Sequence, residues 1–176
     1  SQVLDRAIAL ALDQDQDRLS RVYQLKALLL IDLKRYEEAI PAIDLSIMNA
    51  AGATEKAKAL SVKADILSQI GKLEEALEII HEAIQKDPNR GRFYLFAATI
   101  YQQRGELEEA RDILERGLEN LLELGERFDT PRLYGALLTV LVQLGEIDDA
   151  KFLAPDAEAS GLSREKLRRI LGRNPL

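Results

Sequence analysis

The chain has 176 residues, 47% of them hydrophobic and 31% charged, with a net charge of −6 and no cysteine, and this length fits about one domain with a substantial core. The negative charge disfavours nucleic acid and anionic membranes as partners, the lack of cysteine excludes disulfides, thiolate catalysis and cysteine-based zinc sites, and no apolar run approaches the ~18 residues that span a bilayer. Because most of the abundant residues lose little free energy in a helix, the composition favours an all-α fold.

The first predicted element is an amphipathic helix from Val3 to Leu12, which we assign to a partial repeat over residues 1–16. The sequence begins at Ser1 without a Met, which indicates a processed or trimmed amino terminus. Nothing at the start resembles a charged n-region followed by an apolar h-region. We predict a cytoplasmic location, while a removed signal peptide and an origin as a regulatory domain of a longer protein stay open.

Four helix pairs are predicted next, over residues 20–51, 57–88, 91–124 and 131–160. The second pair shows the pattern most clearly, because steps of three and four place one apolar stripe on its first helix: Ala57, Leu60, Ala64, Leu67 and Ile70. Residues 117–124 extend the third pair and predict about two extra turns of helix. In the fourth pair, Thr130 is expected to be the N-cap and Pro131 the first helical residue.

Two prolines lie inside the second helices of predicted pairs. Pro155 would remove a backbone hydrogen bond and clash with the preceding turn, so we expect the last of these helices to be short or kinked. Pro41 predicts a slight bend in the first one. A final helix over residues 163–172, with Ser163 as its N-cap and Gly172 as its stop, would cover the apolar edge of the last repeat.

A short turn recurs between the two helices of each pair and fixes their register. It consists of an apolar residue, two acids and an alanine, and its copies are Tyr36-Glu37-Glu38-Ala39, Leu73-Glu74-Glu75-Ala76, Leu107-Glu108-Glu109-Ala110 and Ile147-Asp148-Asp149-Ala150. Acids favour the first turn of a helix, where exposed amide groups and the macrodipole attract negative charge. The intervals between copies predict repeats built from helix pairs.

These residues resemble the tetratricopeptide repeat family, whose signature is a 34-residue helix-turn-helix. Where the family has an aromatic, a small and a second large residue in its first helix, this chain has Tyr94, Ala98 and Tyr101. In the last copy Leu138 occupies the small position and Ala154 the large position of the second helix, which predicts a compensating change of volume. The resemblance implies an all-α right-handed superhelix, an α-solenoid of antiparallel helix pairs.

The sequence gives no support for catalysis. Adjacent acids on a helix point in different directions, whereas acid-base hydrolysis needs two carboxyl groups facing each other across a cleft. His81 is the single histidine and is expected at the surface or edge of its helix. No glycine-rich phosphate loop follows a strand. We therefore predict no enzyme activity, no cofactor and no metal site.

The resemblance places the binding surface on the concave face formed by the first helices of the pairs. Four cations, Arg21, Lys58, Arg92 and Arg132, share one position of the register and predict a ladder of positive charge. The remaining groove residues are Gln24, Leu25, Leu28, Ser61, Val62, Asp65, Gln69, Leu95, Phe96, Thr99, Gln103, Gly135, Ala136, Thr139 and Gln143. Cations at helix starts oppose the helix dipole, so a binding role would explain them better than their ordinary solvation does.

The predicted function is a non-catalytic adaptor or scaffold that binds an extended or helical segment of a partner protein, with acidic groups, in this groove. The alternative is a structural scaffold that associates with itself as a homo-oligomer. A local excess of basic residues at the carboxyl end, including Arg168 and Arg169, could serve an anionic partner. It lacks the aromatic side chains that stack on bases, so we interpret it as a solvated capping face.

Overall fold

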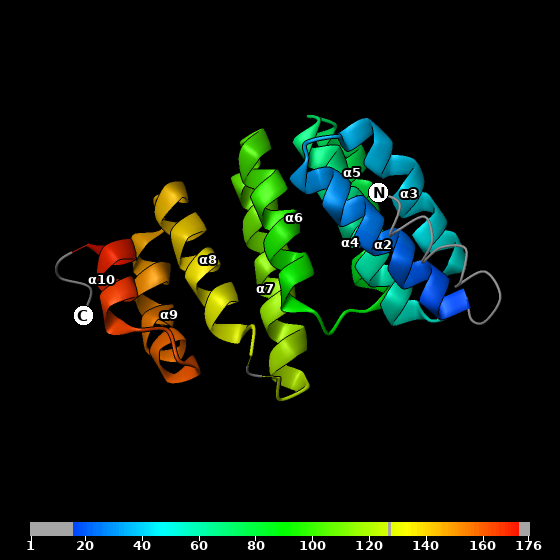
Figure 1. The fold of residues 1–176 in the computed structure, drawn as a ribbon. Coiled ribbons are helices and arrows are strands. Elements are labelled where there is room, and N and C mark those ends of the chain that lie inside the picture. The colour runs from blue at the N-terminus through cyan, green and yellow to red at the C-terminus, as the bar shows by residue number, and fades with distance from the viewer. Residues whose placement is uncertain (1–15, 127, 173–176) are drawn as a thin grey trace. The chain divides into compact units, whose positions relative to one another are not determined.

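The computed structural model describes residues 16–126 and 128–172, so the predicted helix from Val3 to Leu12 lies outside the described residues. In these two ranges every regular element is an α-helix, as Figure 1 shows. The helices are α2 (Gln16–Asp32), α3 (Tyr36–Asn49), α4 (Ala53–Gln69), α5 (Leu73–Lys86), α6 (Gly91–Arg104), α7 (Leu107–Glu123), α8 (Thr130–Leu144), α9 (Ile147–Ser160) and α10 (Arg164–Leu171).

The chain divides between Asp87 and Pro88 into two compact units, which are described separately here. In the first unit α2 packs on α3, α3 on α4 and α4 on α5. In the second unit α6 packs on α7, α7 on α8 and α8 on α9, and α10 contacts both α8 and α9. The first helices of neighbouring pairs also touch within each unit, α2 with α4 and α6 with α8. The assignment of the whole chain to a single domain stays a prediction.

The recurring turn has the same backbone geometry in each pair. Gly71 has a φ of 80° and follows α4, and its left-handed conformation reverses the chain before α5. The amide of Gly71 donates to the carbonyl of Ser68, and the amide of Lys72 donates to the carbonyl of Leu67, which is the Schellman pattern of a helix end. Lys34 takes this left-handed place in the first pair with a φ of 57°. The two acids of each copy lie in the first turn of the next helix, as predicted.

Several predicted helix boundaries differ from the observed ones. α4 begins at Ala53 rather than at residue 57. α7 has 17 residues against 14 in α5, so its extension is closer to one turn than to the two predicted. The N-cap of α8 is Asp129, and Thr130 is already helical, with its hydroxyl donating to the carbonyl of Glu126 at 2.7 Å. Ser163 does cap α10, because its side chain accepts a hydrogen bond from the amide of Lys166.

Pro155 does not shorten its helix. α9 runs for 14 residues through the proline, the same length as α3 and α5, so the prediction of a short helix was wrong. The proline side chain is exposed. Packing of the buried face, which includes Ala150, Ala154 and Ala157, stabilises the helix on both sides of the missing hydrogen bond.

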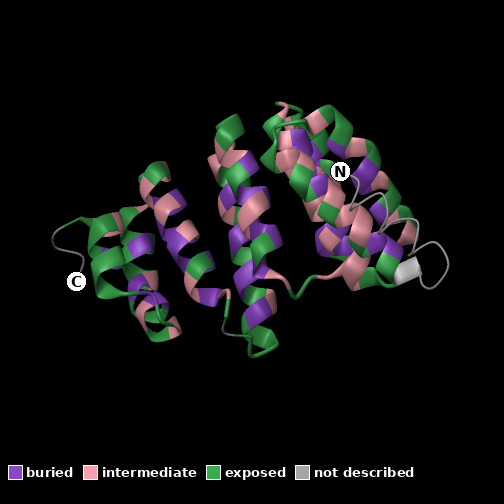
Figure 2. Ribbon diagram, viewed as in Figure 1, coloured by how far each residue is buried: buried purple, intermediate pink, exposed green. Residues whose placement is uncertain are grey.

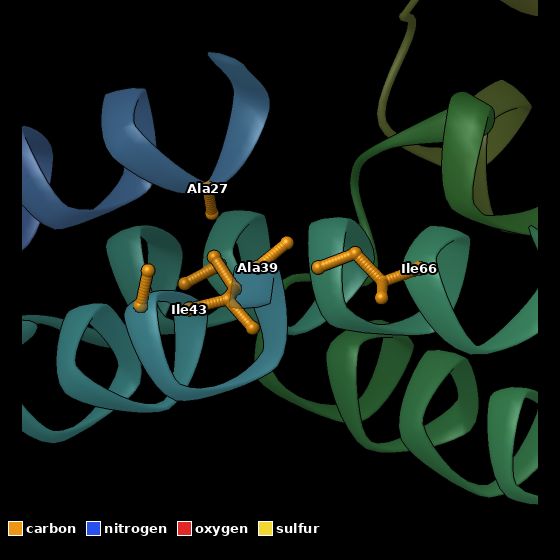
Figure 3. Packing of buried hydrophobic residues seen from close by; sticks show 6 residues of the cluster. Ala27, Ala39, Ile43 and Ile66 are labelled. Carbon is orange, nitrogen blue, oxygen red and sulfur yellow. The ribbon is translucent and has the colours of Figure 1, made fainter. Parts of the chain in front are cut away.

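Small residues at fixed register positions form the centre of each hairpin. The alanines of the four turns, Ala39, Ala76, Ala110 and Ala150, are all fully buried. Figure 2 shows buried residues running along one side of the helices, and Figure 3 shows the core of the first unit, where Ala27 of α2 and Ala39 and Ile43 of α3 lie with Ile66 of α4. Leu138 and Ala154 are also buried, as the predicted change of volume requires.

α6 and α7 approach each other closely in the second unit. A Cβ atom placed on Gly117 would lie 2.7 Å from Cγ and 2.9 Å from Cβ of Tyr94. Beside it, the guanidinium carbon of Arg116 lies 6.0 Å from the centre of the Tyr94 ring. Gly117 therefore lets α7 carry a cation directly over a buried tyrosine.

Candidate functional site

The predicted groove residues fall on four helices: α2 and α4 in the first unit, α6 and α8 in the second. Among them only Gly135 is buried. Because α2 contacts α4 and α6 contacts α8, each unit brings two of the predicted rows side by side.

In the first unit, three predicted residues line one cavity of about 340 Å³. These are Arg21 and Gln24 from α2 and Lys58 from α4, and the cavity also includes Ser20 and Glu55. The first turns of the two helices place both cations at its rim. Two members of the predicted ladder therefore face the same hollow.

An acid that the sequence analysis did not include lies in this cavity. Glu55 forms an ion pair with Lys58, with 3.2 Å between the ammonium nitrogen and the carboxylate oxygen. The pKa of Glu55 is lowered, first by the hydrogen bond from Lys58 and, more weakly, by the charge of Arg21. With two cations and one acid, the lining keeps one net positive charge for an anionic group.

Exposed apolar residues lie next to this cavity along α2. Leu25 is 55% exposed and Leu28 is 40% exposed, values typical of surface positions with no internal packing partner. Val62 of α4, predicted to lie in the same groove, packs against the core cluster and is half-buried. In this unit α2 therefore offers the larger apolar surface.

Several predicted polar residues use their hydrogen bonds within their own helix. The hydroxyls of Ser61, Thr99 and Thr139 donate to the carbonyls of Lys58, Leu95 and Gly135. In α4 the amide of Gln69 donates to the carboxylate of Asp65 at 3.4 Å. The hydroxyl protons of Ser61, Thr99 and Thr139 are therefore used within their own helices.

Each ladder cation of the second unit lies near an aromatic ring. The guanidinium of Arg92 lies 5.5 Å from the centre of the Phe93 ring. Arg132 lies 5.7 Å from the ring of Phe128 and 3.8 Å from the carboxylate of Asp129. Each cation therefore has a local partner near the start of its helix.

Two contacts define the rest of this face in the second unit. The side-chain amide of Gln102 donates to Gln143 at 2.9 Å and joins the last turns of α6 and α8. At the middle of α8, a Cβ atom on Gly135 would lie 3.2 Å from the ammonium nitrogen of Lys166 on α10. α10 thus covers part of the α8 face that the sequence analysis assigned to the groove, and it adds a cation there.

Of the residues that the groove prediction did not include, Glu55 had a signal in the sequence. It precedes Lys58 by three residues, a spacing that pairs opposite charges on a helix. Gln102 bonds to Gln143, which lies 41 residues further along the chain, and Lys166 of α10 lies next to Gly135 of α8. The register within one helix predicts neither contact.

Among the described residues, no cluster of three or more histidine or acidic side chains could hold a metal ion. Within the same residues, no helix has both the length and the apolar character needed to cross a membrane.

Comparisons with known proteins agree with the helix-pair fold. Two family models, each described as a tetratricopeptide repeat, match residues 20–50 and 67–123. Among solved structures, BtubC from P. vanneervenii is similar, with a TM-score of 0.79 and 16% identity over 98% of this chain and 78% of that one.

Two further structures have the same fold. MamA has a TM-score of 0.67 and 14% identity over 90% of this chain and 85% of its own. YrrB, described as a TPR protein with an unusual peptide-binding site, has a TM-score of 0.65 and 16% identity over 97% of this chain and 80% of its own. No curated protein matches the sequence. The predicted fold class, an all-α solenoid of helix pairs, is confirmed.

Proposed function

Because the chain belongs to the tetratricopeptide repeat family, we propose that it binds an acidic segment of a partner protein along the first helices of its pairs. The repeats themselves support a protein-interaction scaffold in general. The family is generally non-catalytic, and we propose the same for this chain. The acidic character of the segment and its location on the first helices are also part of this proposal.

The observation that carries the proposal is the shared cavity of Arg21 and Lys58. Arg21 is exposed at the first turns of α2, and Lys58 is half-buried at the same level of α4. A carboxylate between them would gain two charge-assisted hydrogen bonds, while Glu55 already neutralises part of the charge. The cavity therefore suits one acidic side chain rather than a polyanion such as nucleic acid.

Leu25 and Leu28 supply the apolar half of the site. Both lie on α2, one and two turns beyond Arg21 in the direction of the helix axis, and both are exposed. A segment carrying an acid followed by an aliphatic side chain would cover both features at once. Burial of a leucine or isoleucine side chain contributes roughly 1.5–3 kcal/mol, which would match the contribution of the charge contact.

A library of 12-residue peptides displayed on phage tests the proposal. Selection on the wild-type chain should enrich peptides with Asp or Glu close to Leu, Ile or Val. Synthetic versions of these peptides are then measured by isothermal titration calorimetry against an Arg21→Glu, Lys58→Glu double variant. We expect a loss of affinity of about tenfold or more, because two attractive charges become repulsive.

The matched control is the Lys72→Glu, Lys151→Glu double variant, which makes the same change of net charge on the second helices α5 and α9 and their preceding turns. Both control lysines are exposed. It should bind the selected peptides as the wild type does. Equal losses in the two variants, or selected peptides without acidic residues, would show that the cavity is not the binding site.

Self-association remains the second candidate because α2 carries a row of exposed leucines. Leu25 and Leu29 are 55% and 47% exposed and lie on one face of α2, and Leu33, which directly follows the helix, is 64% exposed. Sedimentation equilibrium over a wide range of concentrations separates the two functions. A mass that stays at that of one chain rules out the homo-oligomer.

A further inference from the structure

A cavity of about 310 Å³ lies among the ends of three helices in the second unit, away from the predicted groove. Its walls are Leu122 from the last turn of α7, Thr130 and Tyr134 from the first two turns of α8, and three residues near the end of α9: Asp156, Ala159 and Ser160. Leu122 belongs to the turn by which α7 exceeds the other second helices. The cavity therefore depends on the extra turn of α7 as well as on the last helix pair.

The polar side chains of the cavity differ in whether they already form hydrogen bonds or ion pairs. Thr130 and Ser160 donate their hydroxyl protons to the helix carbonyls of Glu126 and Ala157, both at 2.7 Å, and keep only acceptor lone pairs. Across residues 16–126 and 128–172, no side chain forms an ion pair with the carboxylate of Asp156. The lining therefore offers mainly hydrogen-bond acceptors and one negative charge.

Tyr134 is the second polar group without a hydrogen bond. Its side chain is only 7% exposed, and its hydroxyl has no hydrogen-bond partner in the described part of the chain. The pKa of Tyr134 is raised, first by burial and then by the charge of Asp156, so the phenol stays neutral. Because Tyr134 lines the cavity, its hydroxyl can form a hydrogen bond with a group bound there.

The preceding repeat shows which group fits beside such a tyrosine. Tyr94 occupies the same register position as Tyr134, and the guanidinium of Arg116 lies over its ring. The residue that corresponds to Arg116 in the last repeat is Asp156. The last repeat thus keeps the tyrosine but has a carboxylate where the previous repeat has its own cation.

From this arrangement we propose that the cavity receives an arginine side chain of a partner protein. The guanidinium pairs with both oxygens of Asp156 and lies against Tyr134, whose hydroxyl oxygen accepts one of its N–H groups. The aliphatic stem of the arginine packs on Leu122 and Ala159. A metal ion would fit poorly, since the lining supplies a single carboxylate.

The positive charge of Arg132 does not oppose this arrangement. Thr130 and Tyr134 are four residues apart and share the face of α8 that lines the cavity, whereas Arg132 lies between them on the opposite face, next to Phe128. The pocket opens at the exposed Leu122, so a side chain can enter from the surface. This site is separate from the acid-binding groove, and a failure of either proposal would leave the other unaffected.

Nuclear magnetic resonance titration with a small probe tests the proposal. The probe is N-acetyl-arginine methylamide, and N-acetyl-citrulline methylamide is its neutral counterpart of nearly the same shape. We expect the arginine probe to cause saturable shifts of the backbone amide signals of Tyr134 and residues 156–160. The citrulline probe should cause none.

Two variants separate the roles of the lining. Asp156→Asn keeps the size of the side chain and should weaken binding of the arginine probe by about tenfold or more, because a charge-assisted pair becomes neutral. Tyr134→Phe keeps the ring and should weaken it by about two- to fivefold through one lost hydrogen bond. The control, Asp148→Asn, removes an exposed carboxylate elsewhere on α9 and should leave the titration unchanged.

Equal shifts with the arginine and citrulline probes would overturn the proposal, as would unchanged binding to the Asp156→Asn variant when its helical circular dichroism matches that of the wild type. Agmatine, which has the guanidinium without a peptide backbone, distinguishes the source of the ligand. If agmatine binds tenfold more tightly than the blocked arginine, the pocket is one for a free amine and not for a partner protein.

Discussion

Replacing Gly117 by alanine should destabilise the second unit, even though alanine is the better helix former. The added Cβ would lie 2.7 Å and 2.9 Å from Cγ and Cβ of Tyr94, atoms too close to the backbone of α6 to move by a simple rotation. Overpacking of this kind costs typically 1–3 kcal/mol. Higher helix propensity offsets up to about 1 kcal/mol of this. We expect a net loss of roughly 1–2 kcal/mol.

Gly135→Ala is the matched control, because it makes the same change in the middle of α8. There the new Cβ would meet the ammonium nitrogen of Lys166 at 3.2 Å and a methyl group of Leu162 at 3.4 Å, and the lysine tip can move. This variant should be neutral or more stable by up to about 1 kcal/mol. The opposite signs of the two substitutions test the packing rather than the helix propensity.

Urea denaturation followed by circular dichroism at the helix band measures both variants. For a chain of this length, 1 kcal/mol corresponds to about 2–4 °C in thermal midpoint, so a melting curve gives a second readout. Combining Tyr94→Ala with Gly117→Ala should cost less than the sum of the two single changes, because the colliding Cγ atom and the ring are removed. If Gly117→Ala is as stable as the wild type, α6 and α7 do not approach each other as closely as the structure shows.

Two further predictions concern α7 and α9. Partial burial and the nearby carboxylates of Asp112, Glu146 and Asp149 raise the pKa of Glu115. The folded chain therefore binds the Glu115 proton more tightly than the unfolded chain does. The stability that this proton contributes is lost as pH rises through the raised pKa. Glu115→Gln should consequently gain stability relative to the wild type at pH 7 but not at pH 4, as measured in parallel urea titrations. Pro155→Ala should stabilise the chain by about 1 kcal/mol or more, since α9 continues through this position without the backbone hydrogen bond; a decrease in the urea midpoint would contradict this.

Much of the fold follows from local sequence alone. The copies of the turn fix where each second helix begins, because an apolar residue, two acids and an alanine suit the start of a helix that packs by its small face. The glycines before three of the turns mark the left-handed residue that ends the first helix. The fully buried alanines Ala39, Ala76, Ala110 and Ala150 could be identified from their spacing, since one register repeats through all four pairs.

The composition of the surface sites could not be derived in this way. Helical register places Arg21 and Lys58 on equivalent positions, but only the contact of α2 with α4 brings them to one cavity and adds Glu55 to it. Likewise, local rules predicted a short or kinked α9, whereas burial of its alanine face lets the helix continue past Pro155.

The sequence by itself determined the family, the all-α class and the register of the repeats, because these depend on residues close together in the chain. Tertiary structure decided which residues face one another across helices. The pocket of Tyr134 and Asp156 shows the difference: it depends on the end of α7, the start of α8 and the end of α9 meeting at one point. No periodicity within one helix contains that information, since each contact joins residues from separate elements.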